Sequence, residues 1–247
     1  MYNPFSLEGK TILITGASSG IGRVTAVECS KLGAKCVITA RNEARLQSTF
    51  TALEGEGHSS IIADLTSNDD ICQLVQSVPS LDGVVNNAGI ALTKLIPFVN
   101  LQDLEKMFSV NTFAPFLLTK ELIKKKKICK GGSIVVTSSL ASKKETYGNA
   151  VYGMTKAAIE SFSRFCALEI AGKHIRVNSV HPGMVNTEMV QELILTQEDL
   201  EKDKKLYPLQ RYGEPQEIAW AIIYLLSNAS AWVTGTSFVI DGGFHLV

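Results

Sequence analysis

The chain contains 247 residues, of which 45% are hydrophobic and 19% are charged, so it has enough apolar side chains for a sizeable core. Lysine plus arginine and aspartate plus glutamate each number 24, which gives a formal net charge of zero. A neutral chain offers no global electrostatic reason to bind nucleic acid or an anionic membrane surface, and we expect neither partner.

Five cysteines are scattered along the chain, and none of them forms a C-x-x-C motif. This irregular set predicts reduced thiols, and neither a disulfide framework nor a metal site is expected. The N-terminal residues contain no apolar signal core, and no apolar run approaches the ~18 residues of a membrane span. We therefore expect a cytoplasmic protein.

Short runs of apolar and β-branched residues recur along the chain, beginning with Thr11–Thr15. Such runs are typical of strands that are buried on both faces of a parallel sheet. The runs that we assign to strands cover residues 11–15, 36–40, 60–63, 83–86, 134–137, 175–180 and 237–240. Helices are expected between them, over roughly residues 21–33, 43–53, 69–77, 100–128, 150–171 and 214–227.

The alternation of strands and helices predicts an α/β fold: a doubly wound, Rossmann-like, three-layer arrangement around a mostly seven-stranded parallel sheet. No linker, repeat or low-complexity segment interrupts the chain, so residues 1–247 are expected to form one domain. The least strand-like segment, about residues 186–212, is charged and is expected to form a helical substrate lid with a turn at Pro208. Ligands of such a sheet bind at the carboxyl ends of the strands.

The turn after the first strand reads TGASSGIG over residues 15–22. Glycines let the backbone approach a pyrophosphate, and the N-terminus of the following helix offers unpaired N–H groups. The spacing is G-x-x-x-G-x-G, but the strand-turn-helix context is the one that a dinucleotide site requires. A Gly/Ser-rich turn without a ligand is the alternative. The cofactor-binding residues expected here are Gly16, Ser18, Ser19, Gly20, Ile21 and Gly22.

Arg41 follows the second strand, at the position that selects between the two nicotinamide cofactors. An acidic residue there would bind a ribose 2′-hydroxyl and repel a 2′-phosphate. Here Ala40 is neutral, and the Arg41 guanidinium is a fork-shaped donor suited to phosphate. The sequence thus favours NADP(H) and leaves NAD(H) open, with a merely solvated arginine as the alternative.

Three further strand ends carry polar or small residues. The carboxylate of Asp64, which precedes Leu65, could accept from an adenine amino group or could serve as an N-cap or turn residue. Residues 86–89, Asn-Asn-Ala-Gly, allow a ligand to approach closely, and their amides could tie strands together in a purely structural turn. Residues 181–187 form a turn that could close over a nicotinamide.

Tyr152 and Lys156 are four residues apart in a predicted helix and therefore stack on one face. A phenol ordinarily has a pKa of about 10, and an ammonium one turn away is expected to lower it. The pair would then exchange a proton near neutral pH, although an ordinary helix-surface pair has the same spacing. Ser139, at the end of the fifth strand, could hold a substrate oxygen beside the phenol or could be an ordinary strand-end serine.

Together these motifs resemble the short-chain dehydrogenase/reductase family, in its single-domain branch. The resemblance runs essentially end to end and rests on TGASSGIG at 15–22, NNAG at 86–89, Asn111, Ser139, Tyr152-x-x-x-Lys156, Pro182-Gly183 and Asp241-Gly242-Gly243. It implies an enzyme that transfers a hydride between a nicotinamide and a carbonyl or secondary alcohol. Tyr152 would be the general acid in reduction and the general base in oxidation.

The resemblance also implies roles for the residues around Tyr152. Lys156 would lower the Tyr152 pKa and hydrogen-bond the nicotinamide ribose, and Ser139 would polarise the carbonyl. Asn111 would hold a water that links Lys156 to solvent. The other cofactor contacts that it implies are Asp64, Leu65, Asn87, Ala88, Gly89, Pro182, Gly183, Val185 and Thr187.

Substrate and assembly follow from the resemblance only in outline. A homotetramer is implied, with a small carbonyl or alcohol substrate that could be bound to a carrier. In similar 3-oxoacyl-carrier-protein reductases, basic residues before strands five and six dock the carrier, and Lys130 and Lys173 occupy those places here. Steroids, polyols and other small ketones are alternative substrates, and a non-catalytic dinucleotide-binding sensor is the alternative function. His181 departs from the family pattern, since many members carry Asn before Pro-Gly.

Overall fold

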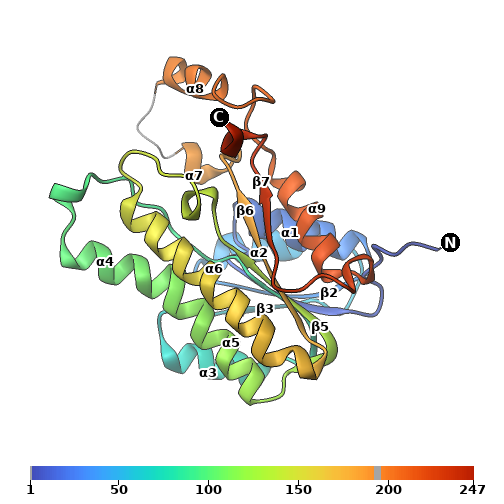
Figure 1. The fold of residues 1–247 in the computed structure, drawn as a ribbon. Helices are drawn as coiled ribbons and strands as arrows, with labels where there is room; N and C mark the ends of the chain where they lie inside the picture. Colours follow the sequence, from blue (N-terminus) through green and yellow to red (C-terminus); the bar gives the residue numbers. More distant parts are fainter. Residues whose placement is uncertain (1, 192–195) are drawn as a thin grey trace.

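The computed structural model describes residues 2–191 and 196–247 and contains a parallel sheet of seven strands (Figure 1). The strands are β1 (Thr11–Thr15), β2 (Lys35–Ala40), β3 (Ser59–Ile62), β4 (Leu81–Asn86), β5 (Ile128–Thr137), β6 (Arg176–Pro182) and β7 (Ser237–Ile240). Their order is β3-β2-β1-β4-β5-β6-β7, so the winding direction reverses between β1 and β4. This arrangement confirms the predicted doubly wound α/β fold.

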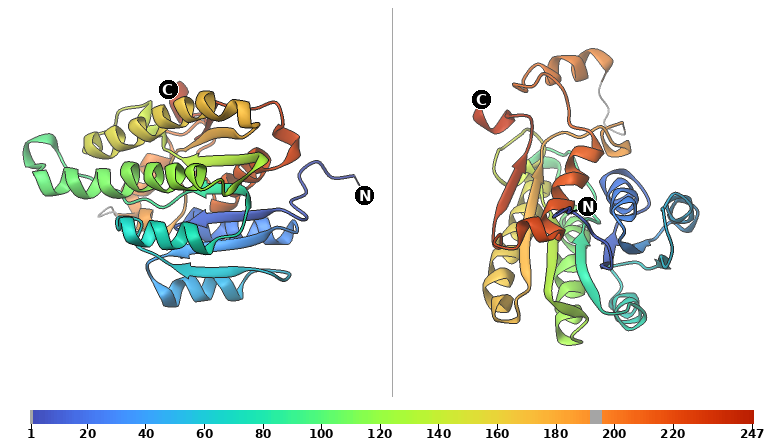
Figure 2. Two further views of the ribbon diagram at one scale, coloured as in Figure 1. Left: turned by 90° about the horizontal axis from the view of Figure 1, so that it is seen from below. Right: turned by 90° about the vertical axis from the view of Figure 1, so that its right-hand side faces the viewer.

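Helices cover both faces of the sheet, as the two views of Figure 2 show. One face packs against α3 (Asn68–Ser77), α5 (Ala114–Lys124) and α6 (Ala150–Ile170), and the other against α1 (Gly20–Lys31), α2 (Glu43–Thr51) and α9 (Pro215–Leu226). Side chains alternate along each strand, so Leu13 lies in the first core while Ile12 and Ile14 lie in the second. None of the helices in the described ranges is both long and apolar enough to cross a membrane.

The helix predicted over residues 100–128 is confirmed from Leu101 to Lys124, but it ends earlier than predicted. Within it, a π-helical turn (Ser109–Phe113) joins α4 (Leu101–Phe108) to α5. The predicted fifth strand also starts too late, because β5 begins at Ile128 and already pairs there with Leu81. Lys126 ends the helix with a positive φ of 54°, and the polar residues that follow it hide the start of the strand from pattern analysis.

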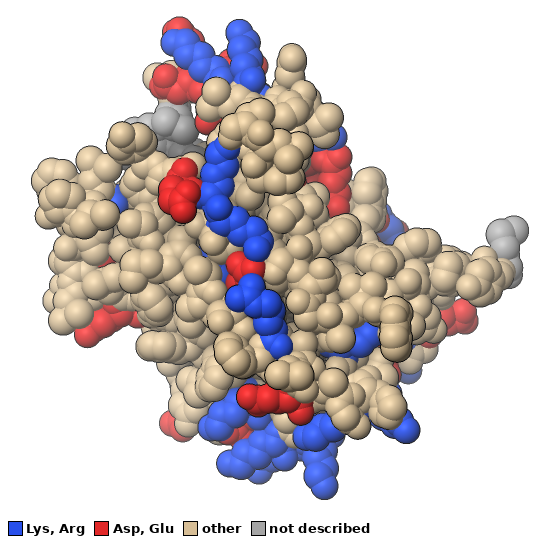
Figure 3. Space-filling model, viewed as in Figure 1, with Lys and Arg blue, Asp and Glu red and all other residues tan. Residues whose placement is uncertain are grey.

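Lys and Arg side chains gather at the end of the molecule where α5 terminates (Figure 3). Lys124 lies in the last turn of α5, where a cation interacts favourably with the helix dipole. The Lys127 ammonium turns toward α3 instead and donates to the carbonyls of Val78, at 2.6 Å, and Gln76, at 3.2 Å. The lysine run at 124–127 therefore stabilises the ends of two helices.

The segment at residues 186–212 lies beyond the carboxyl ends of β6 and β7 (Figure 1). It contains α7 (Glu188–Gln191) and α8 (Gln197–Lys204), and its residues 192–195 lie outside the described part of the chain. The predicted turn at Pro208 is confirmed, since the Gln210 N–H donates to the Tyr207 carbonyl at 2.7 Å. Tyr207 is buried, and its phenol accepts from the Met184 N–H at 3.3 Å, which anchors this segment to the chain after β6.

Gly83 in β4 provides a test of core packing. A Cβ at this position would lie 2.8 Å from Cδ2 of Leu226 and 3.3 Å from Cγ1 of Ile12. Gly83→Ala is expected to lower the free energy of unfolding by about 1–3 kcal/mol, measured by urea denaturation, because the added methyl overpacks the core. Gly172→Ala is the matched control, since a Cβ there meets no atom within 4 Å, and its expected change is within about 0.5 kcal/mol. Equal effects of the two substitutions would contradict this account.

Candidate active site

The ends of four neighbouring strands bring the predicted residues to one edge of the sheet. The Thr15 hydroxyl, at the end of β1, accepts from the N–H groups of Asn87 at 2.9 Å and Ala88 at 3.1 Å. The Ser138 N–H, at the end of β5, donates to the Val180 carbonyl of β6 at 2.9 Å. These bonds fix the turns after β1, β4, β5 and β6 relative to one another.

The turn between β1 and α1 has the geometry of a phosphate cradle. Gly16 has a φ of +63°, and a Cβ on Gly22 would lie 2.3 Å from the Gly16 carbonyl oxygen, so only glycines allow this tight turn. The first turn of α1 receives no side-chain cap from Ser19, its N-cap residue. Thr187 lies across the turn, 3.4 Å from where a Gly20 Cβ would stand. These features suit the pyrophosphate of a dinucleotide.

Arg41 and Asp64 lie at the ends of β2 and β3, with 3.9 Å between the guanidinium Nη1 and the carboxylate Oδ2. This exposed pairing is weak, so the guanidinium can also pair with a phosphate. The Asp64 carboxylate accepts from the N–H and the hydroxyl of Thr66 at 2.9 and 2.8 Å, and the backbone bond lowers the Asp64 pKa. Asp64 is therefore a turn residue here, and its predicted adenine contact stays a prediction.

Ser139 and Tyr152 meet because α6 packs tightly against the 3-10 turn at Leu140–Ser142. A Cβ on Gly153 would lie 2.7 Å from the Ala141 carbonyl oxygen, so a larger residue would separate the helix from the turn. The Tyr152 phenol forms a side-chain hydrogen bond with Ser139. Gly153 was not among the predicted site residues. Its sequence position could have indicated a role, because glycine is unfavourable inside a helix and is kept there only for a packing or functional reason.

Burial decides the protonation of both Tyr152 and Lys156. It raises the pKa of Tyr152 above 10, and the hydrogen bond with Ser139 only partly offsets this effect. On balance the pKa of the phenol is therefore raised by burial, and not lowered as the spacing to Lys156 predicts. The Lys156 ammonium lies 5.7 Å from the centre of the Tyr152 ring, donates to the Thr137 carbonyl at 2.9 Å, and has a pKa lowered by burial to about 8. At neutral pH the phenol is thus protonated and can donate a proton.

The π-helical turn between α4 and α5 directs Asn111 into the same edge. Its Oδ1 accepts from the Ile90 N–H at 2.9 Å, and its Nδ2 donates to the Ile90 carbonyl at 2.9 Å and the Thr155 hydroxyl at 3.1 Å. A Cβ on Gly89 would lie 3.3 Å from both Asn111 Oδ1 and Lys156 Nζ, so these two side chains flank Gly89. Such turns are common at functional sites.

The remaining predicted cofactor contacts differ in how far they are buried in the cores. Val185 is buried in the second core, so only its backbone can face a ligand. Leu65 packs partly against the first core. Pro182 ends β6, and the Gly183 N–H donates to the Ile240 carbonyl at 3.0 Å, which ties this turn to β7.

A buried polar cluster lies behind Ser139. His181 is fully buried, and its Nδ1 lies 3.2 Å from the Ser139 carbonyl oxygen and 3.1 Å from the Ser142 hydroxyl. Burial lowers the pKa of His181 to about 4, so the imidazole is neutral at physiological pH. Burial opposes ionisation of Glu160, but hydrogen bonds from Lys143, Ser237 and Ser142 outweigh it and lower the Glu160 pKa to about 2.

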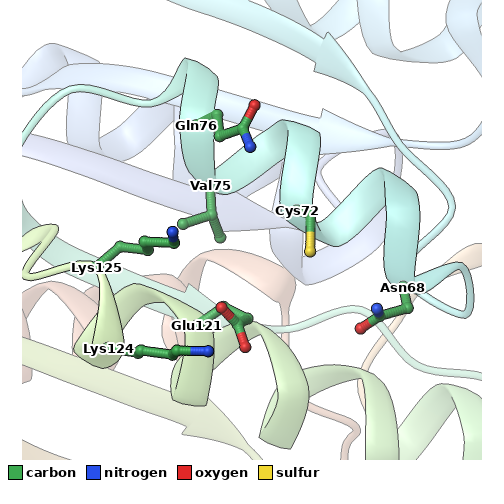
Figure 4. Close-up of a pocket in the computed structure, with 7 residues that line it drawn as sticks. All are labelled: Asn68, Cys72, Val75, Gln76, Glu121, Lys124 and Lys125. Carbon is green, nitrogen blue, oxygen red and sulfur yellow. The ribbon is translucent and has the colours of Figure 1, made fainter.

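A hollow between α3 and α5, lined by Cys72, Glu121 and Lys124 among others, shares no residue with this edge of the sheet (Figure 4). Within residues 2–191 and 196–247, no group of three or more His, Cys, Asp or Glu side chains is arranged to hold a metal ion.

The buried imidazole predicts a loss of stability in acid. The unfolded chain binds a proton at His181 below about pH 6.5, whereas the folded chain does so only near pH 4, so stability falls as the pH drops between these values. This group should lower the free energy of unfolding by about 2 kcal/mol between pH 7 and pH 5. Denaturant titrations of the parent and His181→Asn at pH 7 and pH 5 give the free energy of unfolding of each protein at each pH. The loss between pH 7 and pH 5 should be larger in the parent than in His181→Asn, and equal losses would show that His181 does not titrate in this range.

Comparisons with known proteins agree with this geometry. Residues 16–245 match the family model described as enoyl-(acyl carrier protein) reductase. The chain is 34% identical to the 3-oxoacyl-[acyl-carrier-protein] reductase FabG of Rickettsia prowazekii (strain Madrid E), over 98% of this chain and 99% of that protein. It is 34% identical to the L-xylulose reductase of Caenorhabditis elegans, over 97% of each chain.

Among solved structures, the Pseudomonas aeruginosa RhlG/NADP active-site complex superposes with a TM-score of 0.92, at 32% identity over 99% of this chain and 100% of that one. The relatives and the solved structure match this chain over nearly its whole length. The chain therefore belongs to the short-chain dehydrogenase/reductase family and is an NAD(P)-dependent oxidoreductase acting on CH–OH or C=O groups.

Proposed function

We propose that this protein is an NADP(H)-dependent carbonyl reductase in which Tyr152 is the general acid. The observation that carries the proposal is geometric: the close contact of Gly153 with Ala141 brings the Tyr152 phenol beside Ser139, and the Lys156 ammonium lies 5.7 Å from the centre of the phenol ring. This group lies at the sheet edge that also forms the phosphate cradle. The phenol is protonated near neutral pH, so reduction, in which it donates its proton, is the direction proposed.

Four residues divide the proton chemistry among them. The nicotinamide, when bound, supplies the hydride that reaches the carbonyl carbon. Tyr152 gives its phenolic proton to the carbonyl oxygen, so the carbonyl becomes an alcohol and the phenol a phenolate. Ser139 hydrogen-bonds the same oxygen and holds it in place. Lys156 stabilises the phenolate, and Asn111, beside Lys156, holds the water through which the proton is replaced.

NADP(H) is the cofactor that the described residues suit. Gly16, Gly20 and Gly22 form a cradle that side chains would fill, and it lies at the uncapped N-terminus of α1. Arg41 supplies a guanidinium at the end of β2, where a 2′-phosphate requires a cation. The RhlG structure, which holds NADP, supports the same choice.

A 3-oxoacyl thioester is the leading substrate class, because several relatives are 3-oxoacyl-[acyl-carrier-protein] reductases. A polyol or ketose is the second, because the L-xylulose reductase is equally similar. Lys130 and Lys173 lie at the amino ends of β5 and β6, opposite to Ser139 and Tyr152. Carrier docking on these lysines would thus place the carrier far from the same chain's site, and they carry no weight in the proposal.

We further propose one dinucleotide-binding domain over residues 1–247, with residues 186–212 as its substrate lid, in a cytoplasmic homotetramer. The assembly is supported by exposed apolar side chains on the outer faces of α5 and α6, among them Phe116, Phe165 and Leu168. Exposed apolar residues grouped on adjacent helices suit a helix-to-helix interface between subunits.

Replacing the proton donor tests the chemistry. Tyr152→Phe is expected to reduce turnover by at least about 10³-fold, because the variant has no proton to donate, while NADPH binding stays within a few-fold of the parent. NADPH oxidation should be followed with acetoacetyl-coenzyme A, L-xylulose, a cyclic ketone and a 3-ketosteroid. Substantial residual turnover in the variant would reject Tyr152 as the acid. If the parent protein reduces none of the four compounds, a non-catalytic dinucleotide sensor is favoured instead.

Replacing the guanidinium tests the cofactor. The parent is expected to bind NADPH more tightly than NADH, and Arg41→Ala should weaken NADPH binding about 10-fold or more while NADH binding changes little. Fluorescence titration of both cofactors against both proteins measures the selectivity. Equal affinities in the parent would show that Arg41 is merely solvated. Arg45→Ala is the control, because Arg45 already pairs with Glu188 at 2.8 Å.

A further inference from the structure

We propose that His181, Ser142 and Glu160 are positioning residues that hold Ser139 against Tyr152. The inference rests on the proposed function, in which Ser139 binds the carbonyl oxygen. It assigns a role to the buried polar cluster behind Ser139, none of whose members touches the reacting atoms in the mechanism above.

The Ser139 carbonyl oxygen is the point on which this cluster acts. Two donors hold it, the Ser142 N–H at 3.1 Å and His181 Nδ1 at 3.2 Å. The Ser142 hydroxyl lies 2.9 Å from it and shares its single proton between this carbonyl and the Glu160 carboxylate. The Ser139 hydroxyl in turn accepts from the Ala141 N–H at 3.1 Å. Because both ends of the residue are held, its hydroxyl keeps one direction toward the phenol.

The hydrogen bonds assign the proton on the imidazole. A carbonyl oxygen can only accept, so His181 carries its proton on Nδ1, and Nε2 accepts from the Ser179 hydroxyl at 2.9 Å. A neutral imidazole in this tautomer needs both partners. The charged groups that face it are Glu160, Lys143 and Lys156. Burial and the two lysines keep the imidazole neutral and outweigh Glu160, which favours the charged form.

Glu160 connects the cluster to the helix that carries the proton donor. It lies one turn after Lys156 and two turns after Tyr152, on the same face of α6. Its carboxylate accepts from the Ser142 hydroxyl at 2.9 Å, Lys143 at 2.7 Å, Arg164 at 2.9 Å and the Ser237 hydroxyl at 2.8 Å. The carboxylate thus joins α6 and β7 to the turn after Ser139, which fixes the distance between the serine and the phenol.

A matched pair of substitutions isolates the hydrogen bond from the packing. Asn and Leu have similar size, and an Asn amide nitrogen can stand where His181 Nδ1 stands and donate to the Ser139 carbonyl. With the panel compound that the parent reduces fastest, His181→Leu should lower kcat 10- to 100-fold, and His181→Asn should stay within about five-fold of the parent. The Kd of NADPH should stay within two-fold in both, since neither change touches the phosphate cradle.

His181→Leu should also be made in a Ser139→Ala background, which distinguishes a positioning role from a general loss of stability. If His181 acts through Ser139, His181→Leu should have no further effect on kcat once the serine hydroxyl is absent. An equal loss in both backgrounds would overturn the proposal. If Ser139→Ala leaves kcat unchanged, the proposed function fails. If Ser139→Ala lowers kcat and His181→Leu does not, only the positioning role fails.

Two further measurements keep the proposal testable if His181→Leu does not fold or no compound is turned over. Ser142→Ala removes only a hydroxyl from a half-buried position and should also lower kcat, with partial recovery in Ser142→Thr. Absorbance titration at 295 nm, taken as the difference from Tyr152→Phe, reports the phenol without substrate. The phenol of Ser142→Ala should titrate at higher pH than in the parent, because Ser139 holds it less well. Identical titrations and identical kcat in Ser142→Ala and the parent would overturn the proposal.

Discussion

The close approach of α6 to the turn after β5 is the contact on which the site depends. Gly153 allows it, because a methyl group would lie 2.7 Å from the Ala141 carbonyl oxygen. The approach brings the Tyr152 phenol within hydrogen-bonding reach of Ser139 and places the Lys156 ammonium on the Thr137 carbonyl at the end of β5. One helix and one strand end thereby assemble the proposed proton donor, its cation and the serine proposed to hold the carbonyl.

Burial, more than charge pairing, sets the protonation states at this contact. It raises the pKa of Tyr152, lowers that of Lys156 to about 8 and keeps His181 neutral. Glu160 is the opposite case: four donors outweigh its burial and keep it ionised. The Tyr152 phenol is therefore neutral and protonated, while the ionised Glu160 carboxylate lies behind Ser139, where it holds the scaffold together.

Features governed by local sequence could be predicted, and features governed by distant contacts could not. The strands could be predicted because they are short apolar runs in the sequence. Residues 16–22 follow the first run directly, so the phosphate turn could be predicted as well. The π-helical turn at Asn111 was not, because the extra residue per turn is stabilised by contacts with Ile90 and Thr155. The phenol's pKa was misjudged for the same reason: helix spacing reveals the nearby lysine, whereas burial depends on the whole fold.

In the proposed function, reaction and substrate are specified by different parts of this chain. The proton chemistry resides in β5, α6 and the π-helical turn, which are braced by the two cores and the Glu160 cluster. The described residues of the segment at 186–212 lie outside both cores and are held by separate contacts, such as the bond between Met184 and Tyr207 and the stacking of Tyr207 on Phe244. If this segment is the proposed substrate lid, changes in it alter the shape of the substrate site without disturbing Ser139 or Tyr152. This separation explains how relatives of equal similarity to this chain can be named for thioester and for sugar substrates.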